Sequence, residues 1–193
     1  MPAIDDLLTS VTQCRLCETH LPHGARPLVQ LAPSAKILIA GQAPGSRAHE
    51  SGIPFHDPSG DRLREWLGVS PAVFYDPNQI ALLPMGFCYP GRGKSGDLPP
   101  RSECEPAWRT ELLAQLPHLK MILVLGQYAQ RYHFGATGST LTDRVKSWQT
   151  WWPDKVPLPH PSPRNNAWLS KNPWFERNLL PALKQQIATV LTG

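Results

Sequence analysis

Residues 36–45 read KILIA-GQAPG, a short apolar run followed at once by a segment rich in turn-forming residues. Such a run is typical of a strand buried on both faces, and the glycines and the proline after it end the strand. Comparable runs occur at 79–84, 120–125 and 156–159. Because stretches with helical spacing separate them, the sequence predicts a parallel sheet that helices cover on both faces.

The expected helices cover residues 4–13, 60–67, 104–115, 126–133 and 173–190. We therefore expect an α/β fold, a three-layer α/β/α sandwich around a central, mostly parallel sheet of four strands. No internal repeat or domain boundary is visible, so residues 1–193 are expected to form a single domain. Ligands bind such sheets beyond the carboxyl ends of the strands, which brings together the loops after residues 40, 84, 125 and 159.

The composition excludes several classes of protein. Hydrophobic residues make up 41% of the chain and charged residues 18%, which argues against intrinsic disorder. No apolar run approaches the roughly 20 residues of a membrane span, and the first six residues, MPAIDD, differ from a secretory leader. We therefore expect a cytoplasmic monomer without a membrane partner. The net charge of +4 suits a nucleic-acid partner but is common among other proteins.

The four cysteines form two pairs. Cys14 and Cys17 make a CxxC motif, and Cys88 and Cys104 follow much later with 15 residues between them. A cytoplasmic setting disfavours disulfides, and CxxC is a common half-site for zinc or an iron–sulfur cluster. We expect a four-thiolate metal site, and the alternative is four unrelated buried thiols. The spacing alone does not choose between zinc and a cluster.

Two loops carry a resemblance to a known family. Residues 41–55, GQAPGSRAHESGIPF, resemble the first motif of the iron–sulfur uracil-DNA glycosylases, which runs G-E-A-P-G and then G-x-P-F. Residues 160–165, HPSPRN, resemble the H-P-S motif of that superfamily and, in this longer form, its single-strand-selective branch. The cysteine pattern is similar to that of the cluster-bearing branches. The resemblance implies a [4Fe–4S] cluster on the four cysteines, with zinc as the alternative.

The resemblance also implies a function. Members of this superfamily are base-excision repair enzymes that hydrolyse the N-glycosidic bond of a base flipped out of DNA. The expected substrate is DNA containing uracil, followed by another deaminated base such as hypoxanthine or xanthine. The alternative is a non-catalytic iron–sulfur protein that binds damaged or single-stranded DNA on the same scaffold.

Several residues match positions around the family's base pocket. Phe55 matches a stacking aromatic, and the stiff turn before it could present its ring to the base; the alternative is a core phenylalanine. His160 matches the residue that stabilises negative charge on the uracil O2 atom in the transition state, although a histidine at a strand end is often a loop residue. Gly41, Ala43 and Met85 are expected to contact the base.

The sequence departs from the family pattern at three places. Gln42 replaces the carboxylate of the first motif, and an amide can orient a water but cannot act as a general base. Residues 48–49 are Ala-His where a Glu-Asp pair is usual. The asparagine that reads the uracil edge would fall near Pro84 or Met85, and neither reproduces its hydrogen bonds.

A substitute base is therefore expected in the segment FHDPSGD at 55–61. This string resembles another branch of the superfamily, in which an aspartate before x-S-G serves catalysis. Asp57 is the first choice for activating the attacking water. Asp61 is expected to start or cap the following helix.

The PSPR turn resembles the loop with which the family wedges into the duplex. Arg164 is expected to act there as a plug or a phosphate contact, and Ser162 to hold backbone or phosphate. Asn165 is counted with these DNA contacts, with turn formation as its alternative role.

A glycine-rich segment at 84–101, PMGFCYPGRGKSGDLPPR, follows the second predicted strand. Arg92, Lys94 and Arg101 are expected to contact phosphates while the Cys88 thiolate anchors the loop. The alternative is a solvated loop without a DNA contact.

Overall fold

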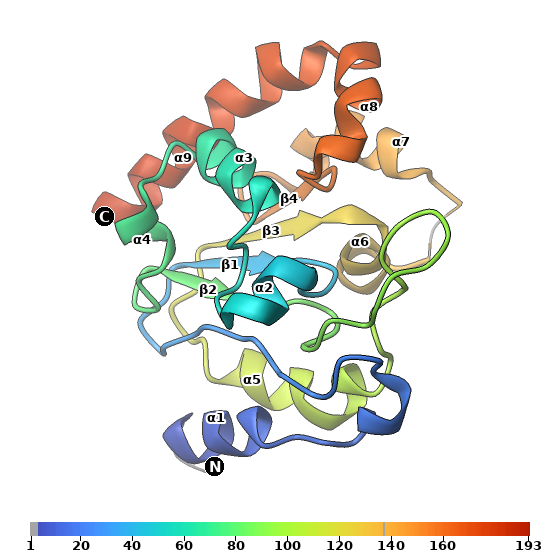
Figure 1. The fold of residues 1–193 in the computed structure, drawn as a ribbon. Coiled ribbons are helices and arrows are strands. Elements are labelled where there is room, and N and C mark those ends of the chain that lie inside the picture. Colours follow the sequence, from blue (N-terminus) through green and yellow to red (C-terminus); the bar gives the residue numbers. More distant parts are fainter. Residues whose placement is uncertain (1–3, 137) are drawn as a thin grey trace.

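The computed structural model describes residues 4–136 and 138–193. Residues 1–3, on which part of the expectation about a leader rests, lie outside these ranges. Four strands form one sheet in the order β2-β1-β3-β4, and every pair of neighbours is parallel (Figure 1). The strands are β1 (Ile37–Ala40), β2 (Ile80–Leu82), β3 (Met121–Leu125) and β4 (Lys155–Leu158). The predicted α/β class and the four-stranded parallel sheet are confirmed.

The central strand β1 shows why the sheet forms here. All four of its side chains are fully buried, and Ile37 and Ile39 pack on one face while Leu38 and Ala40 pack on the other. This alternation follows from the two-residue period of a strand. Because both faces are covered, the run is apolar throughout and not alternating.

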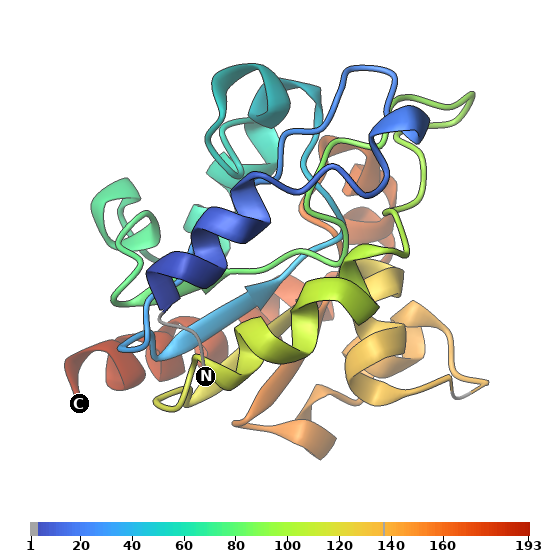
Figure 2. The same cartoon turned by 90° about the horizontal axis from the view of Figure 1, so that it is seen from below.

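Helices cover the two faces of the sheet, as Figures 1 and 2 show from two directions. One face packs against α3 (Pro58–Leu67) and α9 (Leu180–Thr192), through residues such as Trp66 and Leu183. The other packs against α1 (Ile4–Thr12), α5 (Thr110–Ala114) and α6 (Gly126–Phe134). The arrangement is the three-layer sandwich expected from the sequence.

Several elements differ from the predicted ones. The two longest predicted helices each begin with a π-helical turn, at Glu105–Arg109 before α5 and at Phe175–Leu179 before α9. Short helices also fill the connections where only loops were expected: α2 (Ser46–Ser51), α4 (Pro71–Phe74), α7 (Leu141–Lys146) and α8 (Asn166–Lys171). Single 3₁₀ turns lie at Glu18–His20, Trp148–Trp151 and Pro163–Asn165. Within the described ranges, no helix is long and apolar enough to cross a membrane.

Candidate active site

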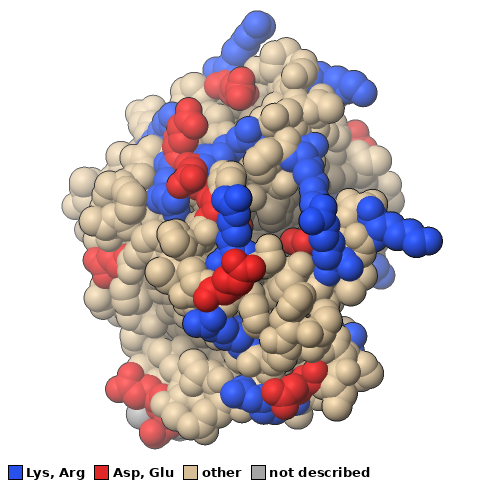
Figure 3. Space-filling model, in the orientation of Figure 1, with Lys and Arg blue, Asp and Glu red and all other residues tan. Residues whose placement is uncertain are grey.

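A cavity of about 960 Å³ opens beyond the carboxyl ends of the strands. Its walls come from the loops after all four strands, as the topology predicts. Figure 3 shows this side of the molecule, where Lys and Arg side chains surround a hollow and carboxylates lie between them. Most of the residues singled out in the sequence line the cavity: Gly41, Gln42, Ala43, Phe55, Asp57, Arg92, Lys94, His160, Ser162, Arg164 and Asn165.

Phe55 stands in the cavity wall in a conformation that few residues adopt. Its φ of 55° is positive, which is a strained backbone state for a phenylalanine. Two glycines allow it. A Cβ on Gly41 would lie 3.3 Å from the Phe55 ring, and a Cβ on Gly60 would lie 1.8 Å from the Phe55 carbonyl oxygen. The ring therefore rests on the backbone after β1, and the chain before α3 wraps closely around Gly60.

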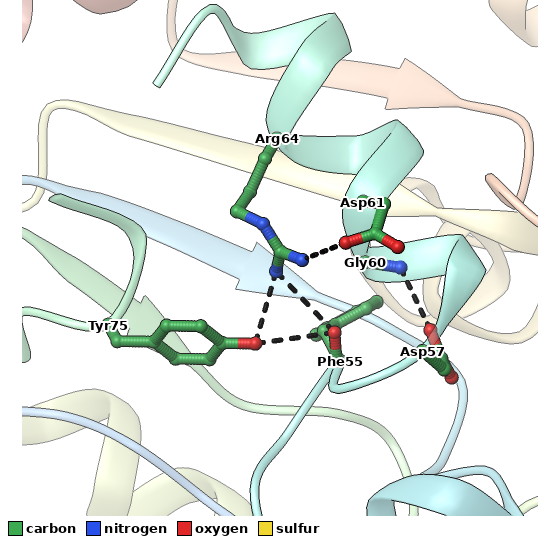
Figure 4. Close-up of polar contacts among 6 residues, drawn as sticks. All are labelled: Phe55, Asp57, Gly60, Asp61, Arg64 and Tyr75. Carbon is green, nitrogen blue, oxygen red and sulfur yellow. Dashed lines mark hydrogen bonds and ion pairs between the residues drawn. The ribbon is translucent and has the colours of Figure 1, made fainter. Parts of the chain in front are cut away.

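The strained peptide is also held by side chains (Figure 4). The Arg64 guanidinium donates to the Phe55 carbonyl at 3.5 Å and to the Tyr75 hydroxyl at 3.1 Å, and that hydroxyl donates to the same carbonyl at 3.3 Å. Phe74 closes the far side with an edge-to-face contact to the Phe55 ring, 5.9 Å between centroids. Several independent contacts thus fix the orientation of the ring.

Asp57 both caps a helix and lines the cavity, and only its place at the cavity was predicted from the sequence. Its Oδ1 atom accepts from the Gly60 backbone N–H at 2.8 Å, so Asp57 is the N-cap of α3 and Pro58 is the first helical residue. The expectation that Asp61 caps this helix is wrong. Asp61 lies one turn further on and pairs with Arg64 at 2.6 Å. Because the cap uses one carboxylate oxygen, the other remains for the cavity.

His160 follows β4 and is oriented by its own loop. Its Nδ1 atom accepts from the Ser162 backbone N–H at 3.2 Å, which places the proton of the neutral ring on Nε2. Burial lowers the pKa of His160 below its ordinary value, and Asp57 and Asp97 act in the opposite direction. The ring is therefore a neutral donor near the cavity. The Asn165 amide donates to the His160 carbonyl at 2.7 Å, so it is committed to holding this loop.

Two other parts of the chain also contact the HPSPRN loop: Arg62 of α3, and Gly96 in the segment 91–98. Arg62 donates to the carbonyls of Pro161 and Ser162, at 3.4 and 3.2 Å. The Ser162 hydroxyl accepts from the Arg164 N–H at 3.3 Å, which caps the 3₁₀ turn. The exposed Arg164 guanidinium lies against Gly96, where a Cβ would come within 2.4 Å of it.

Two residues expected at the site lie elsewhere. The Met85 side chain packs in the core against Ala40, Val124 and Ala129, and its backbone N–H donates to the Gly41 carbonyl at 2.9 Å. The residue therefore supports the first loop from behind and does not line the cavity. Arg101 forms an ion pair with Glu103 and is also absent from the cavity wall.

Residues 91–98 form a small hairpin that makes the wall opposite Phe55. Gly93 donates to Gly96 at 2.6 Å and Leu98 to Gly91 at 2.8 Å through their backbones. Positive φ angles of 96° at Gly91 and 148° at Gly96 explain the glycines. The exposed side chains of Arg92 and Lys94 line the cavity, as expected for phosphate contacts.

The sequence reasoning missed several lining residues, of which Asp97 is the most informative. A Cβ on Gly45 would lie 3.5 Å from Asp57 Oδ2 and 3.8 Å from Asp97 Oδ2, so both carboxylates flank the same glycine. An acidic residue in an otherwise basic, glycine-rich loop was the available signal. Tyr89, Gln127 and Tyr128 also line the cavity, and none belongs to a motif that draws attention.

The four cysteines come from three segments of the chain, and Cys17, Cys88 and Cys104 are buried. None forms a disulfide, and the side chains of Cys17 and Cys88 belong to the same group of buried hydrophobic residues. Burial raises the pKa of Cys88 to about 12 and that of Cys104 to about 11, and in both cases neighbouring thiols raise it further. The Trp108 indole donates to Cys14 Sγ at 3.3 Å. The thiols therefore lie close enough for their charges to interact.

The donor chemistry suits a thiolate-bound metal group. Four free thiols from three segments of the chain share one region, and thiolates are the ligands that zinc and iron–sulfur clusters use. In the part of the chain that the structure describes, no three or more His, Cys, Asp or Glu side chains are grouped to hold a metal ion. The cysteines are thus assembled in one neighbourhood but not closed into a ligating geometry.

A buried arginine joins the cysteine segment to the floor of the cavity. Arg109 has no exposed surface, and it donates to the carbonyls of Leu83 and Pro84 at 3.2 and 2.8 Å. Its guanidinium also lies 3.1 Å from His133 Nε2. Burial lowers the pKa of His133 to about 3, helped by Arg109 and Lys155, so the ring is neutral and accepts from Arg109. This network fixes the end of β2, where Pro84 lines the cavity.

The chain is similar to several known proteins. The family model of the uracil DNA glycosylase superfamily matches residues 28–184. A type-4 uracil-DNA glycosylase of Sulfurisphaera tokodaii is 20% identical over 146 residues, which cover 76% of this chain and 64% of that protein. The chain thus spans less than two thirds of that relative's length. A solution NMR structure of a protein assigned as a uracil DNA glycosylase from Methanosarcina acetivorans has a TM-score of 0.49 and 16% identity, covering 85% of this chain and 98% of that one.

Proposed function

The chain belongs to the uracil DNA glycosylase superfamily, and we propose on this basis that it is a DNA repair glycosylase that hydrolyses the bond between a damaged base and deoxyribose. Uracil is the first proposed substrate, and another deaminated base is the second. The observation that carries the proposal is the cavity itself, because Phe55, Asp57 and His160 line one space beyond the sheet.

His160 stabilises the leaving base in this proposal. Cleavage of the C1′–N bond leaves its electron pair on the base, and in uracil the negative charge collects on the oxygens. The neutral Nε2–H of His160 donates to such an oxygen because Nδ1 is occupied by the Ser162 N–H. A donor that is already oriented stabilises the developing charge without reorganisation in the transition state.

Phe55 holds the flipped base by stacking. Its ring is fixed by Gly41, Phe74 and the hydrogen bonds to its own carbonyl, so the stacking surface exists before DNA binds. A preformed surface lowers the entropic cost of ordering the base. Gly41 and Ala43 line the same part of the cavity.

The attacking water is activated by Asp57. The Oδ1 atom caps α3, and Oδ2 accepts a proton from water while the water oxygen bonds to C1′. Asp57 then passes this proton to the anionic base, which leaves as the neutral free base. Gln42 orients the water through its amide, since it has no charge with which to take a proton.

Cations around the opening hold the DNA backbone. Arg92, Lys94 and Arg164 line the cavity and are exposed, and Arg47 adds a fourth that the sequence reasoning missed. Ser162 presents its hydroxyl beside Arg164. Contacts of this kind position the duplex and make binding depend on salt.

The four cysteines, Cys14, Cys17, Cys88 and Cys104, are proposed to hold a [4Fe–4S] cluster, with zinc as the alternative. A bound group of this kind ties together the chain segments that carry its ligands, and so contributes to folding stability. The support is the neighbourhood of four free thiols. Brown colour with equal amounts of iron and acid-labile sulfide distinguishes a cluster from zinc in the purified protein.

The test of the function is excision from oligonucleotides, single- and double-stranded, that contain uracil, hypoxanthine or xanthine. Alkali then cleaves each abasic site so that product can be counted. We expect excision of at least one base, and His160→Ala is expected to slow it on the order of 100-fold while DNA binding is retained. Binding without any excision by the wild-type protein contradicts the proposal. That outcome favours a non-catalytic damage-binding protein, for which Gln42 in place of a carboxylate is the specific argument.

The lowered pKa of His160 gives a second test. Because burial favours the neutral ring, Nδ1 accepts from the Ser162 N–H at neutral pH, and acid breaks this orienting hydrogen bond by protonating Nδ1, although the Nε2–H remains. Single-turnover excision is therefore expected to stay level from about pH 6.5, the ordinary pKa of histidine, to higher pH, and to fall on acidification. A rate that rises as His160 becomes protonated contradicts the role of a neutral donor.

A further inference from the structure

We propose that Asp97 is a second catalytic carboxylate, which binds the attacking water together with Asp57 in the space that Gly45 leaves open. The inference rests on the proposed glycosylase function and adds a residue to it. Neither the first motif nor the histidine loop contains Asp97; it enters the cavity from the opposite wall, on the 91–98 hairpin.

The position of the water follows from Gly45. A Cβ at this residue would lie in ordinary contact with two carboxylate oxygens, Asp57 Oδ2 at 3.5 Å and Asp97 Oδ2 at 3.8 Å. Glycine has no Cβ, so this point stays open between the two acceptors. The φ of Gly45 is −84°, a value that any residue adopts, so its backbone conformation does not require a glycine.

Both carboxylates also act electrostatically on the leaving-base donor. Asp57 and Asp97 are the charged groups that raise the pKa of His160 against the effect of burial. The Asp97 carboxylate accepts no side-chain or backbone hydrogen bond among the described residues, whereas Asp57 has one oxygen in the α3 cap. Asp97 is therefore the carboxylate with both oxygens available to a reactant.

Two acceptors orient a water better than one. When one water O–H donates to Asp57 and the other to Asp97, the lone pairs on the water oxygen point away from both carboxylates. The oxygen bonds to C1′ as the C1′–N bond breaks, one proton passes to Asp57 while Asp97 holds the other O–H, and the electron pair departs with the base. Proton transfer from the Asp57 carboxylic acid to the base anion restores the carboxylate. The negative charge of the pair also stabilises the positive charge that develops on the sugar.

The experiment compares Asp97→Asn with Asp154→Asn in single-turnover excision on the base that the wild-type protein removes. Asp154 is exposed and precedes β4, at the end of the sheet opposite the cavity. Asp97→Asn is expected to slow excision on the order of 10- to 100-fold, and Asp154→Asn to leave it unchanged. Because Asp97→Asn removes a negative charge near the DNA, binding is expected to be equal or tighter.

A steric variant tests the water position separately. Gly45→Ala fills the space between the two carboxylates, and we expect about tenfold slower excision with unchanged thermal stability. Gly138→Ala is the matched control, since nothing lies within 4 Å of a Cβ there. An NMR titration of His160 is the third readout, and its pKa is expected to be lower in Asp97→Asn than in the wild-type protein.

The outcomes separate the two proposals. If the wild-type protein excises no base, the glycosylase function fails and this inference fails with it. If the wild-type protein excises a base and Asp97→Asn matches its rate, the glycosylase function stands and the role of Asp97 is overturned. A wild-type rate in Gly45→Ala overturns the shared water position.

Discussion

The two walls of the cavity are built in different ways. The first wall, residues 54–60, carries Phe55 and Asp57 and is locked to α3 by Gly60, Arg64 and Tyr75. The second wall, the 91–98 hairpin, is held by its own backbone hydrogen bonds and by contacts near Pro22 and Arg164.

The difference separates two tasks. The first wall presents a ring and a carboxylate in fixed positions, and it tolerates a strained φ because several contacts determine it. The second wall has exposed cations and three glycines over eight residues, so it can adjust to a nucleic-acid backbone. We infer that changes to the first wall cost stability and activity together, while most changes to the second affect DNA contacts alone.

The largest effect is expected for Gly60→Ala in the first wall. Alanine is normally better than glycine inside a helix by about 1 kcal/mol. Here its Cβ would lie 1.8 Å from the Phe55 carbonyl oxygen, so the backbone around Phe55 must move. We expect a loss of about 3 kcal/mol in the free energy of unfolding, measured by urea denaturation, and loss of base excision.

The control for Gly60→Ala is Glu65→Ala, an exposed position in the same helix, which is expected to change stability by less than about 0.5 kcal/mol. A Gly60→Ala protein as stable as the Glu65→Ala protein shows that the first wall is not locked at Gly60.

Much of the scaffold was predictable because it depends on local patterns. The four apolar runs predicted all four strands, and the helical stretches between them predicted the parallel arrangement. The motifs in the loops after residues 40 and 159 predicted that Phe55 and His160 lie at the cavity. The roles that failed depend on geometry across the chain. The cap of α3 is an exception, because Asp57 directly before Pro58 is a pattern typical of an N-cap.

The missing parts of the site are those brought in by packing. Asp97 lies 40 residues beyond Asp57 in sequence, and only the fold of the hairpin places both beside Gly45. Met85 was expected at the base but faces the core, because the chain after β2 must pair its backbone with Gly41. The burial of Arg109 was not predicted, since an arginine in a helix usually faces solvent.

A smaller effect is expected for Arg64→Met, which keeps the apolar stem but removes the donor to Phe55 and Tyr75. Hydrogen bonds from charged groups contribute roughly 1.5–3 kcal/mol, and the Tyr75 hydroxyl still holds the Phe55 carbonyl. We expect a loss of about 2 kcal/mol in urea denaturation. Asp61→Asn breaks only the exposed ion pair and is expected to cost less than about 1 kcal/mol. If both variants lose the same free energy of unfolding, Arg64 stabilises the protein through its ion pair with Asp61 and not through Phe55 and Tyr75.

Asp57 allows the structural and chemical roles of one residue to be separated. Asparagine is as good an N-cap as aspartate, so Asp57→Asn is expected to keep the stability of α3, whereas Asp57→Ala is expected to lose about 1 kcal/mol. Both variants lack the carboxylate and are expected to slow excision equally. Excision that follows stability, fast in Asp57→Asn and slow in Asp57→Ala, contradicts the catalytic role and leaves only the cap.

The smallest effect is expected for Gly93→Ala in the second wall. A Cβ there would lie 3.1 Å from Leu98 Cδ2, the far end of a side chain that is 42% exposed and can turn away. The φ of Gly93 is not positive, and alanine restricts the unfolded chain, so we expect a change within about 0.5 kcal/mol in either direction. Excision is expected to be unchanged, because the hairpin can absorb the methyl group by moving Leu98. If urea denaturation shows that Gly93→Ala lowers the free energy of unfolding as much as Gly60→Ala does, the second wall is as rigid as the first.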